Sequence, residues 1–147
     1  MNYLIIDDEP HAIQLLQDHI KSIDPSLNCL GFSYNKDDAL LKINKLNPDL
    51  IFLDIMLGPH TGFELLNSLP NPNFKIIFTT AYNEFASEAF KHSAIHYLLK
   101  PINKEAVKDA IDRLKNSKEV NDYAFLVNAI KTVQEQSQKR LALPNRT

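Results

Sequence analysis

The sequence predicts an α/β protein, a three-layer sandwich in which a doubly wound, five-stranded parallel sheet lies between two layers of helices. Short apolar runs alternate with segments whose apolar residues have helical spacing, from residue 3 to residue 114. Most of the runs are continuously apolar, as in strands that are buried on both faces. A chain of 147 residues with 44% hydrophobic residues has enough apolar material for one core.

The first half of the chain is expected to supply three strands and two helices. The strands are residues 3–6, 27–32 and 50–54. Pro10 is suited to the first turn of one helix, and Asn35 can cap the other. Pro25 and Pro48 follow the two helical patterns and end them. This half therefore reads as strand, helix, strand, helix, strand.

The second half continues the alternation. Residues 55–60 read as a loop, and Thr61 with Glu64 then has the form of a capping box for a short third helix. The next strands are residues 74–80 and 95–99, with a helix at 84–91 between them that Asn83 caps. Asn103 is expected to cap the last helix. The total is five strands and five helices.

Charged and hydroxyl side chains end these strands. They are Asp7, Asp8, Asp54, Thr80 and Lys100. If the strand order is 2-1-3-4-5, which is flavodoxin-like, the first and third strands are neighbours and the chain reverses direction between them. Ligands of such sheets bind beyond the carboxyl ends of the strands, so we expect these side chains to form one site.

Three carboxylates in one place repel each other unless a cation joins them. Oxygen ligands favour a hard ion such as Mg²⁺, which takes a few carboxylates together with phosphate oxygens. Asp54 can then act as a nucleophile toward a phosphoryl group. Lys100 would supply a second positive charge, and the Thr80 hydroxyl would donate a hydrogen bond to a phosphoryl oxygen.

The chain resembles the receiver domain of a two-component response regulator over residues 1–117. The matching motifs are Asp7-Asp8-Glu9-Pro10, Leu53-Asp54, Gly62, Thr80-Ala81 and Lys100-Pro101. The resemblance implies that a sensor histidine kinase phosphorylates Asp54 and that Asp8, Asp54 and the Met56 carbonyl ligate Mg²⁺. It also implies that Asp7 holds a metal-bound water, that Thr80 and Tyr97 form a switch pair, and that the Lys100-Pro101 peptide is cis.

Residues 80–90 and 96–102 further resemble receivers joined to a LytTR-type DNA-binding domain. We therefore expect a receiver at residues 1–117, a linker helix at 118–138 and the start of a DNA-binding domain at 139–147. Phosphorylation is expected to pair receivers into homodimers through the helix at 84–91, the fifth strand and the last helix. DNA contact would come only from the C-terminal domain.

One position departs from the family pattern. Most receivers have a proline four residues after the phosphorylated aspartate, whereas this chain has Gly58 there and Pro59 next. Met56 and Tyr82 lie two residues beyond Asp54 and Thr80, and neither side chain can orient a water for hydrolysis. We expect slow loss of the phosphoryl group.

Composition narrows the alternatives. A net charge of −2 gives no electrostatic basis for nucleic-acid or membrane-surface binding by this stretch, and Cys29 has no disulfide partner in the sequence. No apolar run approaches the roughly 18 residues of a membrane span, so we expect a cytoplasmic protein. Two other functions stay open, a stand-alone phosphorelay receiver and a Mg²⁺-dependent phosphatase. Such a phosphatase typically has a second aspartate where this chain has Met56.

Overall fold

A five-stranded parallel sheet forms the centre of the protein. The computed structural model describes residues 1–69, 73–81 and 96–116. The strands of the sheet are β1 (Asn2–Ile6), β2 (Asn28–Ser33), β3 (Leu50–Asp54), β6 (Lys75–Thr80) and β7 (His96–Leu99). Their order is β2-β1-β3-β6-β7, with every pair parallel. This is the predicted order 2-1-3-4-5, because β6 and β7 are its fourth and fifth strands.

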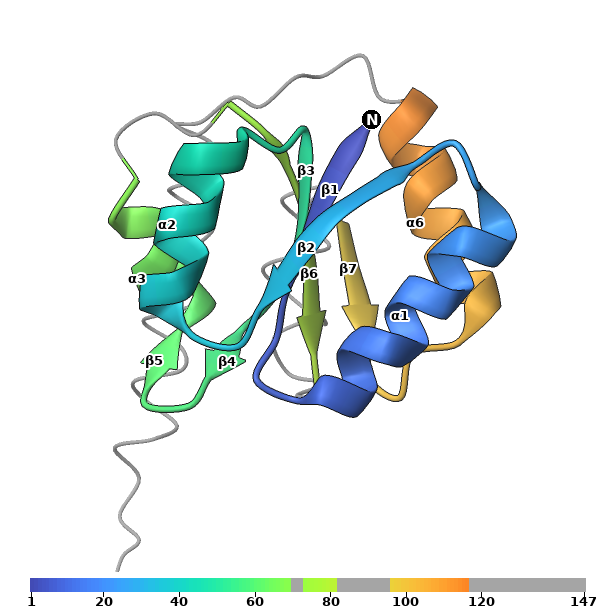
Figure 1. Ribbon diagram of the computed structural model, residues 1–147. Helices are drawn as coiled ribbons and strands as arrows, with labels where there is room; N and C mark the ends of the chain where they lie inside the picture. Colours follow the sequence, from blue (N-terminus) through green and yellow to red (C-terminus); the bar gives the residue numbers. More distant parts are fainter. Residues whose placement is uncertain (70–72, 82–95, 117–147) are drawn as a thin grey trace, which may run out of the picture.

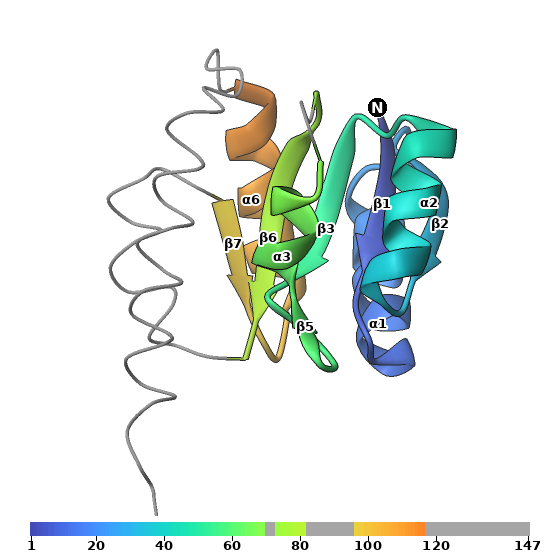
Figure 2. The same cartoon turned by 90° about the vertical axis from the view of Figure 1, so that its left-hand side faces the viewer.

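Helices cover both faces of this sheet (Figure 1). The first layer is α1 (Pro10–Ile23) and α6 (Lys104–Asn116), and the second is α2 (Lys36–Leu46) and α3 (Gly62–Asn67). Figure 2 shows α2 and α3 side by side on their face of the sheet. Each face has its own apolar cluster, and β3 supplies both because its side chains alternate between them. The predicted three-layer sandwich is confirmed.

The predicted helix caps are present in three helices. The Asn35 Oδ1 accepts a hydrogen bond from the Asp38 N–H at 2.8 Å, and the Thr61 Oγ1 accepts one from the Glu64 N–H at 3.1 Å. The Asn103 Oδ1 does the same for the Ala106 N–H at 2.8 Å. These bonds satisfy N–H groups that a helix leaves unpaired in its first turn.

The structure corrects the expectation of a loop at residues 55–60. Most of this stretch belongs to a small antiparallel hairpin, β4 (Met56–Leu57) and β5 (His60–Thr61). Gly58 has a φ of 61°, which permits a two-residue turn between the strands. Figure 1 shows this hairpin at the end of the sheet where α1 begins.

Other boundaries differ by a residue or more. β2 runs from Asn28 to Ser33 rather than 27–32, and its pairing with β1 shifts between Tyr3 and Leu4. The expected helix at 84–91 with its cap Asn83, the linker helix at 118–138 and the segment 139–147 lie outside the described residues. Within the described ranges, no helix is long and apolar enough to span a membrane.

Candidate functional site

Lys100 is the central cation of the site. Its Nζ lies 2.8 Å from Asp7 Oδ2 and 3.0 Å from Asp54 Oδ2, and its side chain is only 13% exposed. Since β6 separates β7 from β3 in the sheet, the Lys100 side chain crosses the end of β6 to reach these carboxylates. The structure therefore brings together three of the predicted residues from three different strand ends.

Backbone N–H groups also bind the carboxylates. Asp54 Oδ1 accepts a hydrogen bond from the Met56 N–H at 3.1 Å, and Asp7 Oδ1 accepts one from the Glu9 N–H at 2.9 Å. Asp8 Oδ2 accepts one from the Gly58 N–H at 3.1 Å. Each predicted aspartate is thus oriented by at least one donor.

The charges in this cluster shift each other's protonation. Burial raises the pKa of Asp54 from its ordinary 3.8 to about 7, and the negative charge of Asp7 adds to the increase, while Lys100 and the Met56 N–H oppose it. Burial alone lowers the pKa of Lys100, but the hydrogen bond with Asp7 and the charges of Asp54 and Asp7 outweigh burial and raise it. Lys100 therefore stays charged, and a further cation would favour the ionised form of Asp54.

Ligand oxygens for a metal gather at the start of α1. One carboxylate oxygen from each of Asp7, Asp8 and Glu9 lies within 4.8 Å of the others. Oxygen donors of this kind fit Mg²⁺. Glu9 was not among the predicted ligands, although three consecutive acidic residues were a visible signal. Asp54 is connected to this group through Lys100 rather than being a member of it.

Gly62 lets α3 approach the site. A Cβ at this position would lie 2.5 Å from the Asp54 carbonyl oxygen, closer than atoms can pack. The Gly62 N–H donates to the Ile55 carbonyl at 2.7 Å. The glycine eight residues after Asp54 is therefore needed because the backbone following β3 folds back onto the end of that strand.

The two threonines that end β6 face opposite sides of the sheet. Thr80 is on the same face as Phe78 and Tyr97, which pack in the cluster beneath α2 and α3. Thr79 is in register with Asp54, and its buried Oγ1 has no hydrogen-bond partner within the described part of the chain. The sequence gave no sign that the Thr79 hydroxyl would be buried in register with Asp54.

Comparison with known proteins identifies the family. The model of the response regulator receiver domain matches residues 3–112. This chain belongs to that family. Receiver domains are phosphoacceptor signalling modules of two-component systems, work with a histidine kinase and are not turnover enzymes. The phosphatase alternative is therefore set aside.

Relatives and solved structures agree with this assignment. The chain is 39% identical to an uncharacterised response regulatory protein of Vibrio vulnificus over 115 residues, covering 78% of this chain and 47% of that protein. It is 35% identical to the transcriptional regulatory protein BtsR of Salmonella typhi, covering 84% of this chain and 52% of BtsR. The chain spans about half the length of these curated relatives.

Two solved receivers have the same architecture. The response regulatory domain of mrkE from Klebsiella pneumoniae superposes with a TM-score of 0.67 at 29% identity, over 78% of this chain and 95% of that chain. The regulator TrrA from Thermotoga maritima, solved in complex with Mg²⁺-BeF, gives a TM-score of 0.64 at 28% identity, over 77% and 97%. Receiver domains bind Mg²⁺ at an acidic pocket, and this chain has an acidic cluster, Asp7, Asp8 and Glu9, at the start of α1. The Lys100-Pro101 peptide is cis, as the family resemblance implied.

Proposed function

We propose that Asp54 is the phosphoryl acceptor of this receiver. The observation that carries the proposal is the position of its carboxylate, buried at the end of β3 and held between Lys100 and the Met56 N–H. Both donors neutralise negative charge, and a phosphoryl oxygen could replace the carboxylate as their acceptor. Asp54 is also the aspartate nearest the middle of the sheet, beside the reversal point between β1 and β3.

The transfer exchanges one bond to phosphorus for another. A carboxylate oxygen of Asp54 forms the new P–O bond, and the P–N bond to the kinase histidine breaks with its electron pair returning to the imidazole. Asp8, Asp54 and the Met56 carbonyl are the proposed ligands of Mg²⁺, and Asp7 would hold a metal-bound water; the ion would offset the charge of the phosphoryl oxygens. Lys100 would add a second positive charge close to Asp54.

Phosphorylation is proposed to change the surface near β7 through Thr80 and Tyr97. The Thr80 hydroxyl would bond the phosphoryl group, and Tyr97 would turn into the space that Thr80 leaves. Support comes from the strand register, which puts both residues on one face of the sheet at its β7 edge. Leu99 is 39% exposed at that edge and gives the surface an apolar component. We propose that this surface pairs two receivers.

The output proposed for the full protein is transcriptional control by a LytTR-type DNA-binding domain in the cytoplasm. The resemblance of residues 80–90 and 96–102 supports it, as does the relative named a transcriptional regulatory protein. A stand-alone phosphorelay receiver is the second candidate. The coding sequence beyond Thr147 distinguishes them, because only the first requires a DNA-binding domain there.

The acceptor is tested by incubating the chain with acetyl phosphate and Mg²⁺ and measuring intact mass. The wild type is expected to gain one phosphoryl group, and Asp54→Asn none. Asp112→Asn, an exposed aspartate on α6, is the matched control and should be phosphorylated like the wild type. Equal phosphorylation of Asp54→Asn and the wild type would refute the assignment.

Dimerisation is tested by sedimentation with Mg²⁺ and beryllofluoride, a phosphoryl mimic. The expected result is a shift from monomer to dimer at micromolar concentration, lost in Leu99→Lys. An unchanged mass in the presence of the mimic would reject the proposed pairing surface.

A further inference from the structure

The hairpin that follows β3 contacts two aspartates from different strands. Its Met56 N–H donates to Asp54, two residues earlier, and its Gly58 N–H donates to Asp8, which is 50 residues away in the chain. Met56 and Gly58 are two residues apart, so extended backbone directs both N–H groups to the same side. The hairpin therefore ties the end of β3 to the loop that follows β1.

Only certain residues can occupy position 58 in this geometry. Gly58 has a φ of 61° and begins the two-residue turn between Leu57 and His60, where a type II′ turn places glycine. A Cβ at Gly58 would meet nothing within 4 Å, so the requirement comes from the backbone angle and not from space. Proline, the usual residue of receivers at this position, has no N–H and a negative φ. It could not donate this bond.

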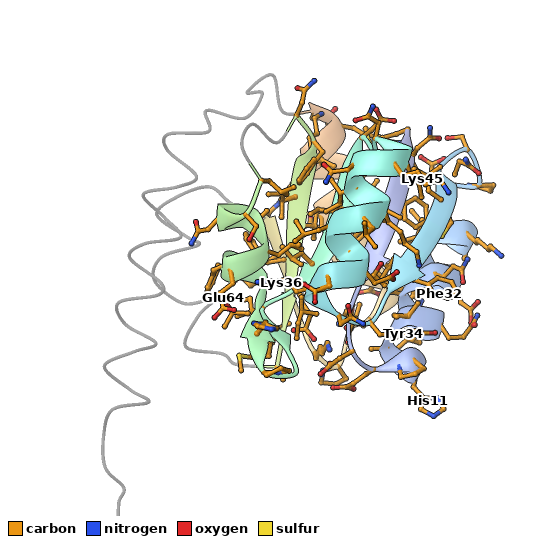
Figure 3. The ribbon with its side chains drawn as sticks, turned by 60° about the vertical axis from the view of Figure 1, so that its left-hand side comes forward. His11, Phe32, Tyr34, Lys36, Lys45 and Glu64 are labelled. Carbon is orange, nitrogen blue, oxygen red and sulfur yellow. The ribbon has the colours of Figure 1, made fainter. Side chains whose placement is uncertain are left out.

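The remainder of the hairpin is fixed by a neighbour. His60 Nδ1 lies 2.8 Å from Glu64 Oε2, which joins β5 to the first turn of α3. Figure 3 labels Glu64 on α3. The Gly62 N–H bond to Ile55 closes the base of the hairpin. The Gly58 N–H therefore belongs to a hairpin that hydrogen bonds hold at β5 and at its base.

Asp8 differs from Asp7 and Asp54 because one of its carboxylate oxygens has no partner among the described residues. Both carboxylate oxygens of Asp7 and both of Asp54 have hydrogen-bond or ion-pair partners. Asp8 is exposed, and among the described residues only its Oδ2 is bonded, to Gly58. That bond restricts the orientation of an exposed side chain and leaves Oδ1 available to a cation. Mg²⁺ demands near-octahedral geometry, so fixing a ligand in advance strengthens its binding.

We propose that Gly58 is a positioning residue for Mg²⁺: its N–H, presented by the tight turn with Pro59, holds Asp8 in the orientation that binds the ion. The inference rests on the proposed metal site and adds a residue that does not touch the metal. It also gives the glycine at position 58 a function, since the usual proline would remove the donor.

The test exchanges the two turn residues. The variant G58P/P59G keeps the composition but removes the N–H and the left-handed position, and Gly58→Asn keeps both, because asparagine tolerates positive φ. Mg²⁺ affinity of the full chain is measured by titration calorimetry, and folding stability by urea unfolding in EDTA. We expect the exchange to weaken Mg²⁺ binding about tenfold, as is typical for lost support of a metal ligand. Gly58→Asn should bind like the wild type.

Gly31 provides a matched control because it has a φ of 148° in the middle of β2, away from the site. Gly31→Ala should lower the urea midpoint and leave the Mg²⁺ affinity unchanged. Unchanged affinity in G58P/P59G, or an equal loss in Gly31→Ala, would overturn this inference alone. Failure of the wild type to bind Mg²⁺ would overturn the proposed function together with it.

Discussion

A loop and a hairpin build the site, and they contribute different chemistry. The loop after β1, residues 7–9, supplies carboxylate side chains, whereas the hairpin after β3, residues 55–61, supplies backbone N–H groups through Met56 and Gly58. The loop concentrates negative charge, and the hairpin supplies hydrogen-bond donors to it. The carboxylates can lie close together at the C-terminal ends of the strands because Lys100 and these N–H donors offset their negative charge.

The largest expected effect is the loss of Lys100, the only cation that the described residues bring to Asp7 and Asp54. Lys100→Met should slow phosphoryl uptake from acetyl phosphate about 100-fold or more, because it removes a positive charge from the reacting group. Uptake is followed by intact mass. Lys115→Met is the control. Lys115 is 44% exposed and pairs with Asp24, which lies at the C-terminal end of α1, whereas the site lies at the start of that helix. Equal rates for both variants would contradict the role of Lys100.

The close approach of the start of α3 to the end of β3 is tested by Gly62→Ala. The new methyl group would overlap the Asp54 carbonyl oxygen, which lies 2.5 Å from the Cβ position. We expect the free energy of unfolding to fall by about 2 kcal/mol, as for other forced overpacking. Asn67→Ala, an exposed change in the same helix, should have little effect. A urea midpoint for Gly62→Ala equal to that of the wild type would show that the backbone is not confined there.

Lys100 and the Met56 N–H do not fully offset the effect of burial and of Asp7 on the Asp54 carboxylate. The pH dependence of folding stability therefore tests this imbalance. The pKa of Asp54 is raised from 3.8 to about 7, so the folded state binds a proton more tightly than the unfolded state. Its contribution to stability is present below pH 4 and is lost as the pH rises toward 7. In EDTA, the stability of the wild type relative to Asp54→Asn should therefore fall as the pH rises from 4 to 8, because only the wild type has a buried carboxyl group that must ionise.

Mg²⁺ supplies the control for that measurement. Added metal should stabilise the wild type more than Asp54→Asn, because it binds the ionised carboxylate. A wild type whose stability relative to Asp54→Asn does not change between pH 4 and pH 8 would contradict the raised pKa.

The smallest expected effect concerns the lifetime of the phosphoryl group. Met56 is half-buried two residues beyond Asp54 and has no group that can orient water. Met56→Asn should accelerate loss of the phosphoryl group a few-fold, measured as decay of the phosphorylated mass after acetyl phosphate is removed. Met56→Leu should decay like the wild type. Identical lifetimes for all three proteins would reject the idea.

The acidic loop after β1 could be predicted from the sequence, and the hairpin after β3 could not. Asp7, Asp8 and Asp54 follow apolar runs, and such runs become parallel strands whose ends meet. The hairpin depends on the φ of Gly58 and on a backbone hydrogen bond to Asp8. Neither feature produces a pattern of side chains that could be recognised in the sequence. The glycine and proline there indicated a turn but not its strands or its donor.

The other site residues depended on surroundings that the sequence alone does not show. The sequence assigned the hydroxyl role to Thr80 and could not show that the Thr79 hydroxyl is buried in register with Asp54. Glu9 was not among the predicted ligands, although its carboxylate lies with those of Asp7 and Asp8. The helix caps at Asn35, Thr61 and Asn103 were correct because they depend on neighbouring residues alone.

The central claim is that phosphorus becomes bonded to the carboxylate that Lys100 and Met56 hold. Borohydride reduces an acyl phosphate to an alcohol, so phosphorylation with acetyl phosphate and Mg²⁺, then reduction and peptide mass spectrometry, marks the acceptor. We predict conversion of Asp54 to homoserine and of no other aspartate. Reduction at Asp7 or Asp8 instead, or at no residue of a chain that has gained phosphoryl mass, would contradict the account.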